Sequence, residues 1–137
     1  MKANELMFGD WVFCDGQPTP SKVVIQTVSI DGVWFEGDKF EGSASFDHIF
    51  PIPITTEILE KNGFDIQYQG GMRFDVWCSF GPDSEGDIEI EFRGQEPIHL
   101  KIDGTYKGVY YTSANMKYVH ELQHALRLCG IEKEIVL

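Results

Sequence analysis

Apolar and polar residues alternate with a period of two over much of the chain, and this period predicts β-strands. The N-terminal runs are short: GDWVFC (9–14), KVVIQTVSI (22–30) and VWF (33–35). Asp31-Gly32 separates the last two runs, and this dipeptide favours a tight hairpin because a type I′ turn needs positive φ at both central residues. The pattern predicts a small β-barrel of the SH3-like kind over residues 1–53.

The segment FPIPIT (50–55) interrupts this pattern. Its two prolines cannot donate hydrogen bonds to a β-ladder, so a boundary between two domains is expected after residue 53. A helix should follow directly, because Thr55 or Thr56 can cap its start and Gly63 can end it in a left-handed conformation.

Four runs of strict alternation come after this helix, separated by turns that contain Gly or Pro. Their apolar residues are Phe64, Ile66 and Tyr68; Phe74, Val76, Cys78 and Phe80; Ile88, Ile90 and Phe92; and Ile98, Leu100 and Ile102. A further strand is expected over 106–112 and a last helix from about 114 to 129. This order predicts an antiparallel sheet with helices against its apolar face, so residues 54–137 should form an α+β layer.

Composition narrows the function classes. The 137 residues include 22 acids and 11 bases, a formal net charge of −11. This balance disfavours nucleic acid as a partner, because phosphate binding needs clustered Lys and Arg. The sequence has no run of 18 apolar residues and no apolar signal-peptide core, which favours a cytoplasmic protein without a membrane span. The three cysteines form no CxxC pair, so neither a disulfide framework nor a Cys-based zinc site is expected.

The motif HELQH at 120–124 is the strongest chemical signal in the sequence. On a helix, HExxH holds zinc through its two His residues and uses the Glu as general base. A helical wheel, however, places His120 and His124 opposite the apolar face and therefore in solvent. No His follows His124, and Glu132 and Glu134 lie too close behind the helix end to reach back easily. The remaining candidates for a third zinc ligand are His48 and His99, upstream in the sequence.

A second candidate surface lies on the outward face of the predicted second sheet. Its residues are Arg73, Asp75, Trp77, Glu89, Glu91, His99 and Lys101. Trp77 is a large apolar side chain among charged ones, and such a residue is often covered by another surface. Arg73, Trp77, His99 and Lys101 are therefore candidates for an interface, either with the N-terminal barrel or with a partner or ligand; simple exposure is the third alternative.

Three segments resemble a known family: KANELMFGDWV, PIPITTEILEKNGF and KYVHELQHALRL. They are similar to short uncharacterised proteins of Bacteroides-type gut bacteria and of their phages and mobile elements. In that family Gln and Asn stand at the positions of Glu121 and His124, so the resemblance implies that HExxH is not a family motif. It brings no catalytic residues, and it implies a bacterial or phage product that is not secreted.

Together these patterns predict a non-enzymatic interaction or accessory module. Its protein partner and its oligomeric state are left open, and no cofactor is expected. The alternative is a zinc-dependent hydrolase with His120 and His124 as ligands and Glu121 as base. A nucleic-acid-binding barrel is the third hypothesis, which the acidic charge disfavours.

Overall fold

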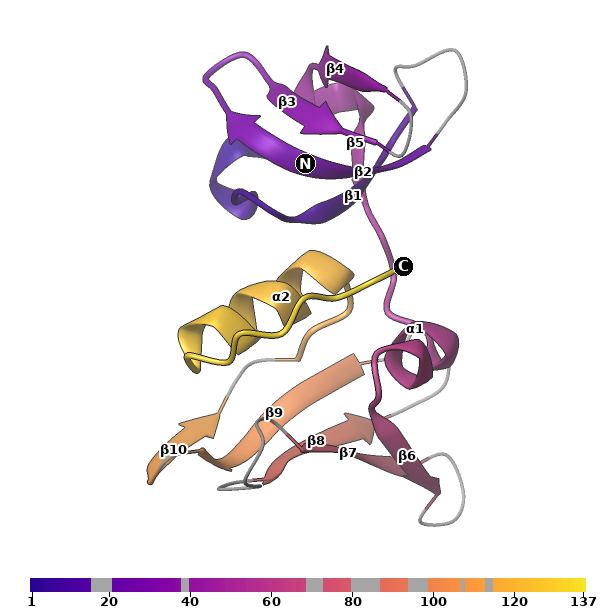
Figure 1. The fold of residues 1–137 in the computed structure, drawn as a ribbon, viewed down its shortest axis with the longest axis vertical. Helices are drawn as coiled ribbons and strands as arrows, with labels where there is room; N and C mark the ends of the chain where they lie inside the picture. The colour runs from indigo at the N-terminus through magenta and orange to yellow at the C-terminus, as the bar shows by residue number, and fades with distance from the viewer. Residues whose placement is uncertain are drawn as a thin grey trace. The chain divides into compact units, whose positions relative to one another are not determined.

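The computed structural model describes residues 1–15, 21–37, 40–68, 73–79, 87–93, 99–106, 108–112 and 115–137. The chain divides into two compact units, Met1–Ile52 and Pro53–Leu137, and the boundary predicted after residue 53 lies one residue away from this division. Each unit contains an antiparallel five-stranded sheet, and both α-helices belong to the second unit (Figure 1). The described chain is thus mainly β, with an α+β second half.

Unit 1 contains strands and single turns of 3-10 helix. These are η1 (Ala3–Glu5), β1 (Trp11–Cys14), β2 (Ser21–Val28), β3 (Val33–Glu36), β4 (Glu41–Ala44), η2 (Phe46–His48) and β5 (Ile49–Pro51). The strand order is β4-β3-β2-β1-β5, with β4 and β5 at the edges. The sheet is open: among the described residues no strand pairing closes it into the predicted barrel. The edge strands have only four and three residues and so offer few hydrogen bonds for closure.

The core of unit 1 follows the alternation seen in the sequence. Every second residue of β1 and β3 is buried. The buried cluster contains Leu6, Val12, Cys14, Val23, Ile25, Val33, Phe35 and Ile49. A β-bulge shifts the β2–β3 register between Ile25 and Thr27.

The turn between β2 and β3 corrects one prediction about glycine. The Ser29 N–H and hydroxyl both donate to the Gly32 carbonyl, at 2.8 and 3.0 Å, so the turn spans four residues. Gly32 is not among the glycines with positive φ in the described chain. It is required for another reason, because a Cβ at this position would collide with the Ala44 carbonyl oxygen.

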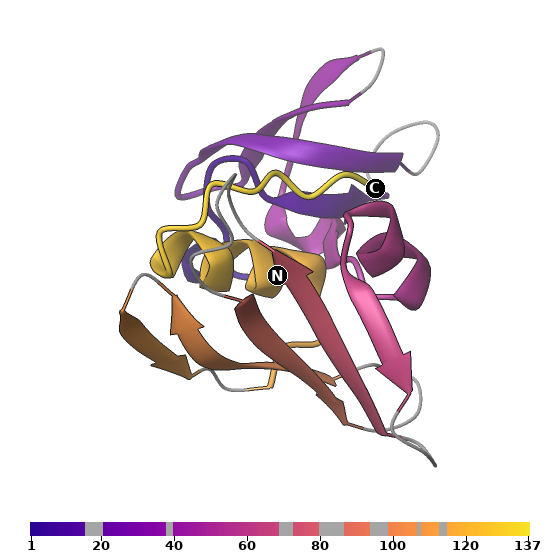
Figure 2. The ribbon, with the colours of Figure 1, turned by 60° about the horizontal axis from the view of Figure 1, so that its bottom comes forward.

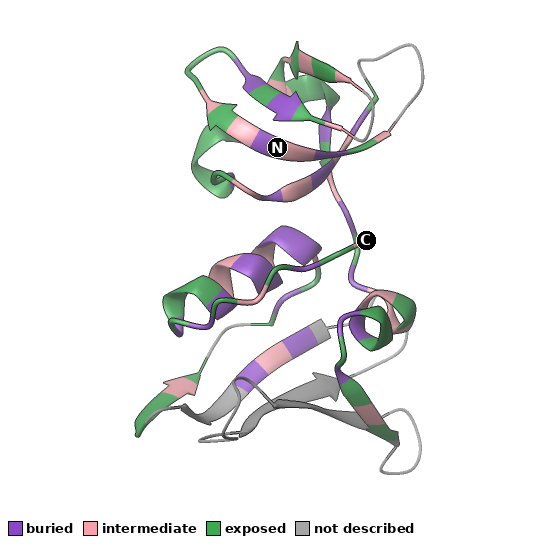
Figure 3. Ribbon diagram, viewed as in Figure 1, coloured by how far each residue is buried: buried purple, intermediate pink, exposed green. Residues whose placement is uncertain are grey.

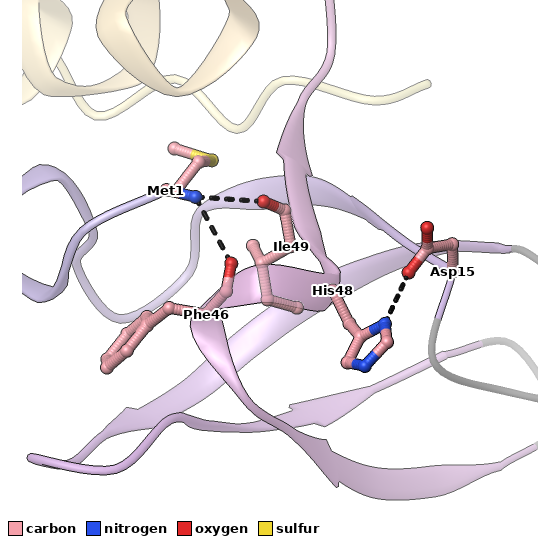
Figure 4. Close-up of polar contacts among 5 residues, drawn as sticks. All are labelled: Met1, Asp15, Phe46, His48 and Ile49. Carbon is pink, nitrogen blue, oxygen red and sulfur yellow. Dashed lines mark hydrogen bonds and ion pairs between the residues drawn. The ribbon is translucent and has the colours of Figure 1, made fainter.

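Polar contacts fasten the segment between β4 and β5 (Figure 4). The Met1 amino group donates to the carbonyl oxygens of Phe46 and Ile49, at 3.2 and 3.1 Å. The Nδ1 atom of His48 lies 2.8 Å from the Asp15 carboxylate. These contacts hold the N-terminus and the end of β1 against the η2–β5 segment.

In its described residues, unit 2 contains two helices and five strands. They are α1 (Thr56–Lys61), β6 (Asp65–Tyr68), β7 (Arg73–Ser79), β8 (Asp87–Arg93), β9 (His99–Tyr106), β10 (Val109–Thr112) and α2 (Val119–Leu128). The strand order β10-β9-β8-β7-β6 is a simple meander, and its neighbouring strands are antiparallel as predicted. Helix α1 begins after Thr55, whose hydroxyl accepts a hydrogen bond from the Ile58 N–H, and Gly63 follows it with φ 76°.

Helix α2 begins at Val119, so the predicted start near 114 is wrong. The preceding residues are extended because they pair with other backbone. Met116 and Leu100 exchange two hydrogen bonds of 2.6 and 2.7 Å, and the Ile54 N–H donates to the Lys117 carbonyl. These bridges use backbone groups that a helix would need for itself.

Within unit 2, α2 lies over one face of the sheet in both views (Figures 1 and 2). The apolar face predicted for it is confirmed, since Val119, Leu122 and Leu126 are fully buried (Figure 3). On the sheet, Leu100 and Ile102 of β9 are buried as well. No helix in the described residues is long and apolar enough to span a membrane.

The C-terminal segment 131–137 runs back from α2 to α1 as extended chain (Figure 1). It is attached by the buried side chain of Asn62. Its Nδ2 donates to the carbonyls of Ile58 and Val136, at 2.7 and 2.8 Å, and its Oδ1 accepts from the Val136 N–H at 2.8 Å. Ile131 and Ile135 are buried. No pattern in the sequence predicts this attachment.

Candidate functional site

The glutamate of HELQH caps a helix. Glu121 is the third residue of α2, and its Oε2 accepts hydrogen bonds from the backbone N–H groups of Lys117 and Tyr118, at 2.7 and 3.1 Å. This is the glutamate half of a capping box, which satisfies N–H groups that have no partner inside the helix. The structure therefore gives the Glu121 carboxylate a structural role at the helix start.

The two histidines of the motif do not both face solvent, and that prediction is wrong for His120. Its side chain is only 5% exposed, and Gln123 beside it is also buried. The His120 ring stacks on Tyr118 with 5.9 Å between centroids and meets the His124 ring edge-on at 5.8 Å. The helical wheel failed here because the first turns of α2 are buried on more than their apolar face.

In the part of the chain that the structure describes, no group of three or more His, Cys, Asp or Glu side chains could hold a metal ion. His48, one of the two upstream candidates for a third ligand, pairs with Asp15. The side chain of His99 lies outside the described part of the chain.

The predicted Trp77 surface is described only through its backbone. The register pairs Trp77 with Glu89, Asp75 with Glu91, and Glu91 with Lys101, so these positions share one face of the sheet as predicted. The side chains of Arg73, Trp77 and His99 lie outside the described part, and Lys101 is half-buried. The interface expected around Trp77 stays a prediction.

A different surface emerges on unit 1, opposite its core. We call it the outer face and define it by Trp11, Phe13, Val24, Thr27, Trp34, Glu36, Glu41, Ser43 and Phe50. These residues alternate with core residues along the strands and lie beside one another through the strand register. Trp34 is 49% exposed and Phe50 42%, so two large aromatic side chains reach solvent there.

An open depression of about 400 Å³ lies at the end of the outer face that contains Trp34. Strands β2, β3 and β4 and the turn between β2 and β3 form its walls. It is lined by Thr27, Ser29, Asp31, Gly32, Val33, Trp34, Ser43, Ala44 and Ser45. Ile30, 92% exposed, stands in the same turn. The described lining combines the Trp34 ring, hydroxyl-bearing residues and Asp31 with the apolar residues Val33 and Ala44.

The sequence contained a signal for this site. In the run VWF, both Val33 and Phe35 belong to the core, so the alternation sends Trp34 to the opposite side. The position of the depression could not be read in the same way, because it depends on the bulge in β2 and on the approach of β4 to Gly32.

Comparisons of the chain with protein-family models, with curated proteins and with solved structures give no match. The function is therefore inferred from the geometry of the chain itself.

Proposed function

We propose that the protein is a non-enzymatic interaction module that binds a short segment of a partner protein on the outer face of unit 1. The observation that carries this proposal is the exposure of Trp34 and Phe50 on a face that the core does not use. Solvent-exposed aromatic residues on a rigid sheet are typical of interaction surfaces, because they offer much contact area with few rotatable bonds.

The proposal includes a relationship of unit 1 to partly open barrels of the SH3-like kind. It is supported by the strand order β4-β3-β2-β1-β5 and by the 3-10 turn η2 between β4 and β5. The resemblance of the three sequence segments to proteins of gut bacteria and their phages supports an accessory role inside the bacterial cell.

Selection from a displayed library of random peptides tests the proposal without assuming a partner. The wild-type protein should enrich a recognisable consensus, and a variant carrying both Trp34→Ala and Phe50→Ala should not, although its circular dichroism spectrum and melting curve stay close to those of the wild type. Selected peptides are then synthesised and titrated by calorimetry. If both proteins enrich the same peptides, or neither enriches any, the outer face does not bind protein segments.

A further inference from the structure

The geometry points to a specific ligand group: the depression beside Trp34 takes the guanidinium group of an arginine in the partner segment. This inference rests on the proposed function, because it names the side chain that one end of the outer face recognises.

The aromatic wall of the depression is the first argument. Trp34 is directly opposite Thr27 on β2 and Ser43 on β4, and both of these neighbours are exposed. The indole therefore has a hydroxyl-bearing residue on each side, while Val33 and Ala44 contribute apolar lining to the same depression. An apolar ligand would remove those hydroxyls from water without replacing their hydrogen bonds. A planar cation can stack on the indole and still donate to the hydroxyls, and tryptophan is the strongest aromatic partner for cations.

The acceptors around the ring are the second argument. Asp31 lines the depression and is exposed, so its carboxylate is accessible to a ligand. The hydroxyl groups of Thr27, Ser43 and Ser45 add further acceptors in the same wall. Among the lining residues that the structure describes there is neither Lys nor Arg. A guanidinium group carries five N–H donors in one plane, which suits several oxygen acceptors around a flat ring.

Charge outside the depression favours the same ligand. Glu36 and Glu41 are directly opposite each other on β3 and β4, two pairs along from Trp34 and Ser43 and therefore on the same face of the sheet. Like charges in this arrangement destabilise a sheet, and they become favourable when a cation lies between or beside them. Over residues 1–52 the sequence has eight acids and three lysines, a formal net charge of −5. A basic segment would therefore be attracted to unit 1 before it makes contact.

The size of the depression is also suitable. Its volume of about 400 Å³ falls within the range of about 300–1,000 Å³ that is typical of sites for small ligands. An arginine side chain reaches such a site on a long flexible stem, while the rest of its peptide follows the outer face.

Titration of the full chain with three short peptides tests the inference. The probes are acetyl-Gly-Arg-Gly-Arg-Gly amide, the same peptide with lysine in place of arginine, and the same peptide with citrulline. Chemical-shift changes of backbone amides give both the affinity and the location of binding. The arginine peptide should shift the amides of residues 27–34 and 43–45. The lysine peptide should bind several-fold more weakly, and the neutral citrulline peptide about 10-fold or more weakly, because the charge is lost.

Two pairs of variants separate this site from general attraction to an acidic protein. Trp34→Ala should lower the affinity for the arginine peptide about 10-fold. The control is Phe8→Ala, which removes an aromatic ring that is 69% exposed outside the depression. It should change the affinity for the same peptide less than about 2-fold. Asp31→Asn should weaken binding about 5-fold. Asp47→Asn changes the charge equally on an exposed residue elsewhere in unit 1 and should have little effect.

The inference is overturned if citrulline binds as well as arginine, if Asp47→Asn weakens binding as much as Asp31→Asn, or if the shifted amides lie outside the depression. Trp34→Phe serves as the conservative variant and should restore part of the affinity that Trp34→Ala loses. If random peptides are selected through the outer face but contain no arginine, the inference fails and the proposed function stands. If no peptide of any composition is selected through that face, the proposed function fails with it.

Discussion

The two units bury the same kind of sheet in different ways. In unit 1 the core cluster is made by inward residues of the sheet and by the N-terminal segment around Leu6, and the outer face keeps Trp34 and Phe50 in solvent. In unit 2 helix α2 lies over the sheet, and Glu121 of HELQH caps the start of that helix. A recognisable motif can thus serve folding, while an unremarkable run such as VWF leaves a large aromatic side chain exposed on the surface.

The largest expected effect tests whether α2 covers the sheet of unit 2. Leu126 is fully buried, so Leu126→Ala should lower the free energy of unfolding by about 3 kcal/mol through lost burial and an unfilled cavity. Leu128 is on the same helix but 83% exposed, and Leu128→Ala should change it by less than about 0.5 kcal/mol. Urea unfolding followed by circular dichroism measures both. Equal effects would contradict the orientation of α2.

A smaller effect is expected at the attachment of the C-terminal segment. Asn62→Ala removes three hydrogen bonds and leaves the Val136 N–H and carbonyl without their partner, which should cost about 2 kcal/mol. Hydrogen exchange at the Val136 amide should become faster.

Lys61→Ala is the matched control for Asn62. Lys61 donates from an exposed side chain to the Leu137 carbonyl, and its loss should change stability by less than about 0.5 kcal/mol. The opposite outcome is a Val136 amide that stays protected from exchange in Asn62→Ala. In that case the burial of Ile131 and Ile135 holds the C-terminal segment, and the hydrogen bonds of the Asn62 side chain do not.

The same contrast explains how far the sequence predicts this structure. Strands β6 to β10 follow from alternation, because each run has one face to bury. Helix α1 follows from Thr55 and Gly63. The start of α2 and the hydrogen bonds from Asn62 to the C-terminal segment could not be predicted, since both depend on contacts between distant parts of the chain. For the candidate site, Trp34 was visible in the pattern, but the depression around it required the path of β4.

The next prediction tests the role of HELQH. Glu121→Ala should lower the free energy of unfolding by about 1 kcal/mol, because two backbone N–H groups at the start of α2 lose their acceptor. Glu121→Gln should lower the free energy of unfolding less, since the amide oxygen of glutamine can still accept these hydrogen bonds. Thermal unfolding of both variants measures the difference.

Elemental analysis of protein purified without a histidine tag is the companion measurement. We expect no stoichiometric zinc in the wild type or in His124→Ala. One zinc per chain, lost in His124→Ala, would favour the alternative in which His120 and His124 are ligands and Glu121 is a base.

The smallest expected effect lies at the start of α1, the helix that holds the C-terminal segment. Hydrogen bonds from its own backbone N–H and from the Thr55 hydroxyl lower the pKa of Glu57 below its usual value of 4.5. Because the pKa is lower in the folded state than in the unfolded state, the ionised carboxylate adds stability above the unfolded pKa. This contribution is lost as the pH falls through the folded pKa. Thr55→Ala should return the pKa of Glu57 towards 4.5, and Thr55→Ser should keep it low because the hydroxyl remains. Carbon-detected NMR titration of the Glu57 carboxylate measures the change.

An unaltered pKa in Thr55→Ala would mean that the Thr55 hydroxyl does not contribute to the shift. A pKa that rises in Thr55→Ala while the Val136 amide stays protected would show that Asn62 holds the C-terminal segment independently of the helix cap.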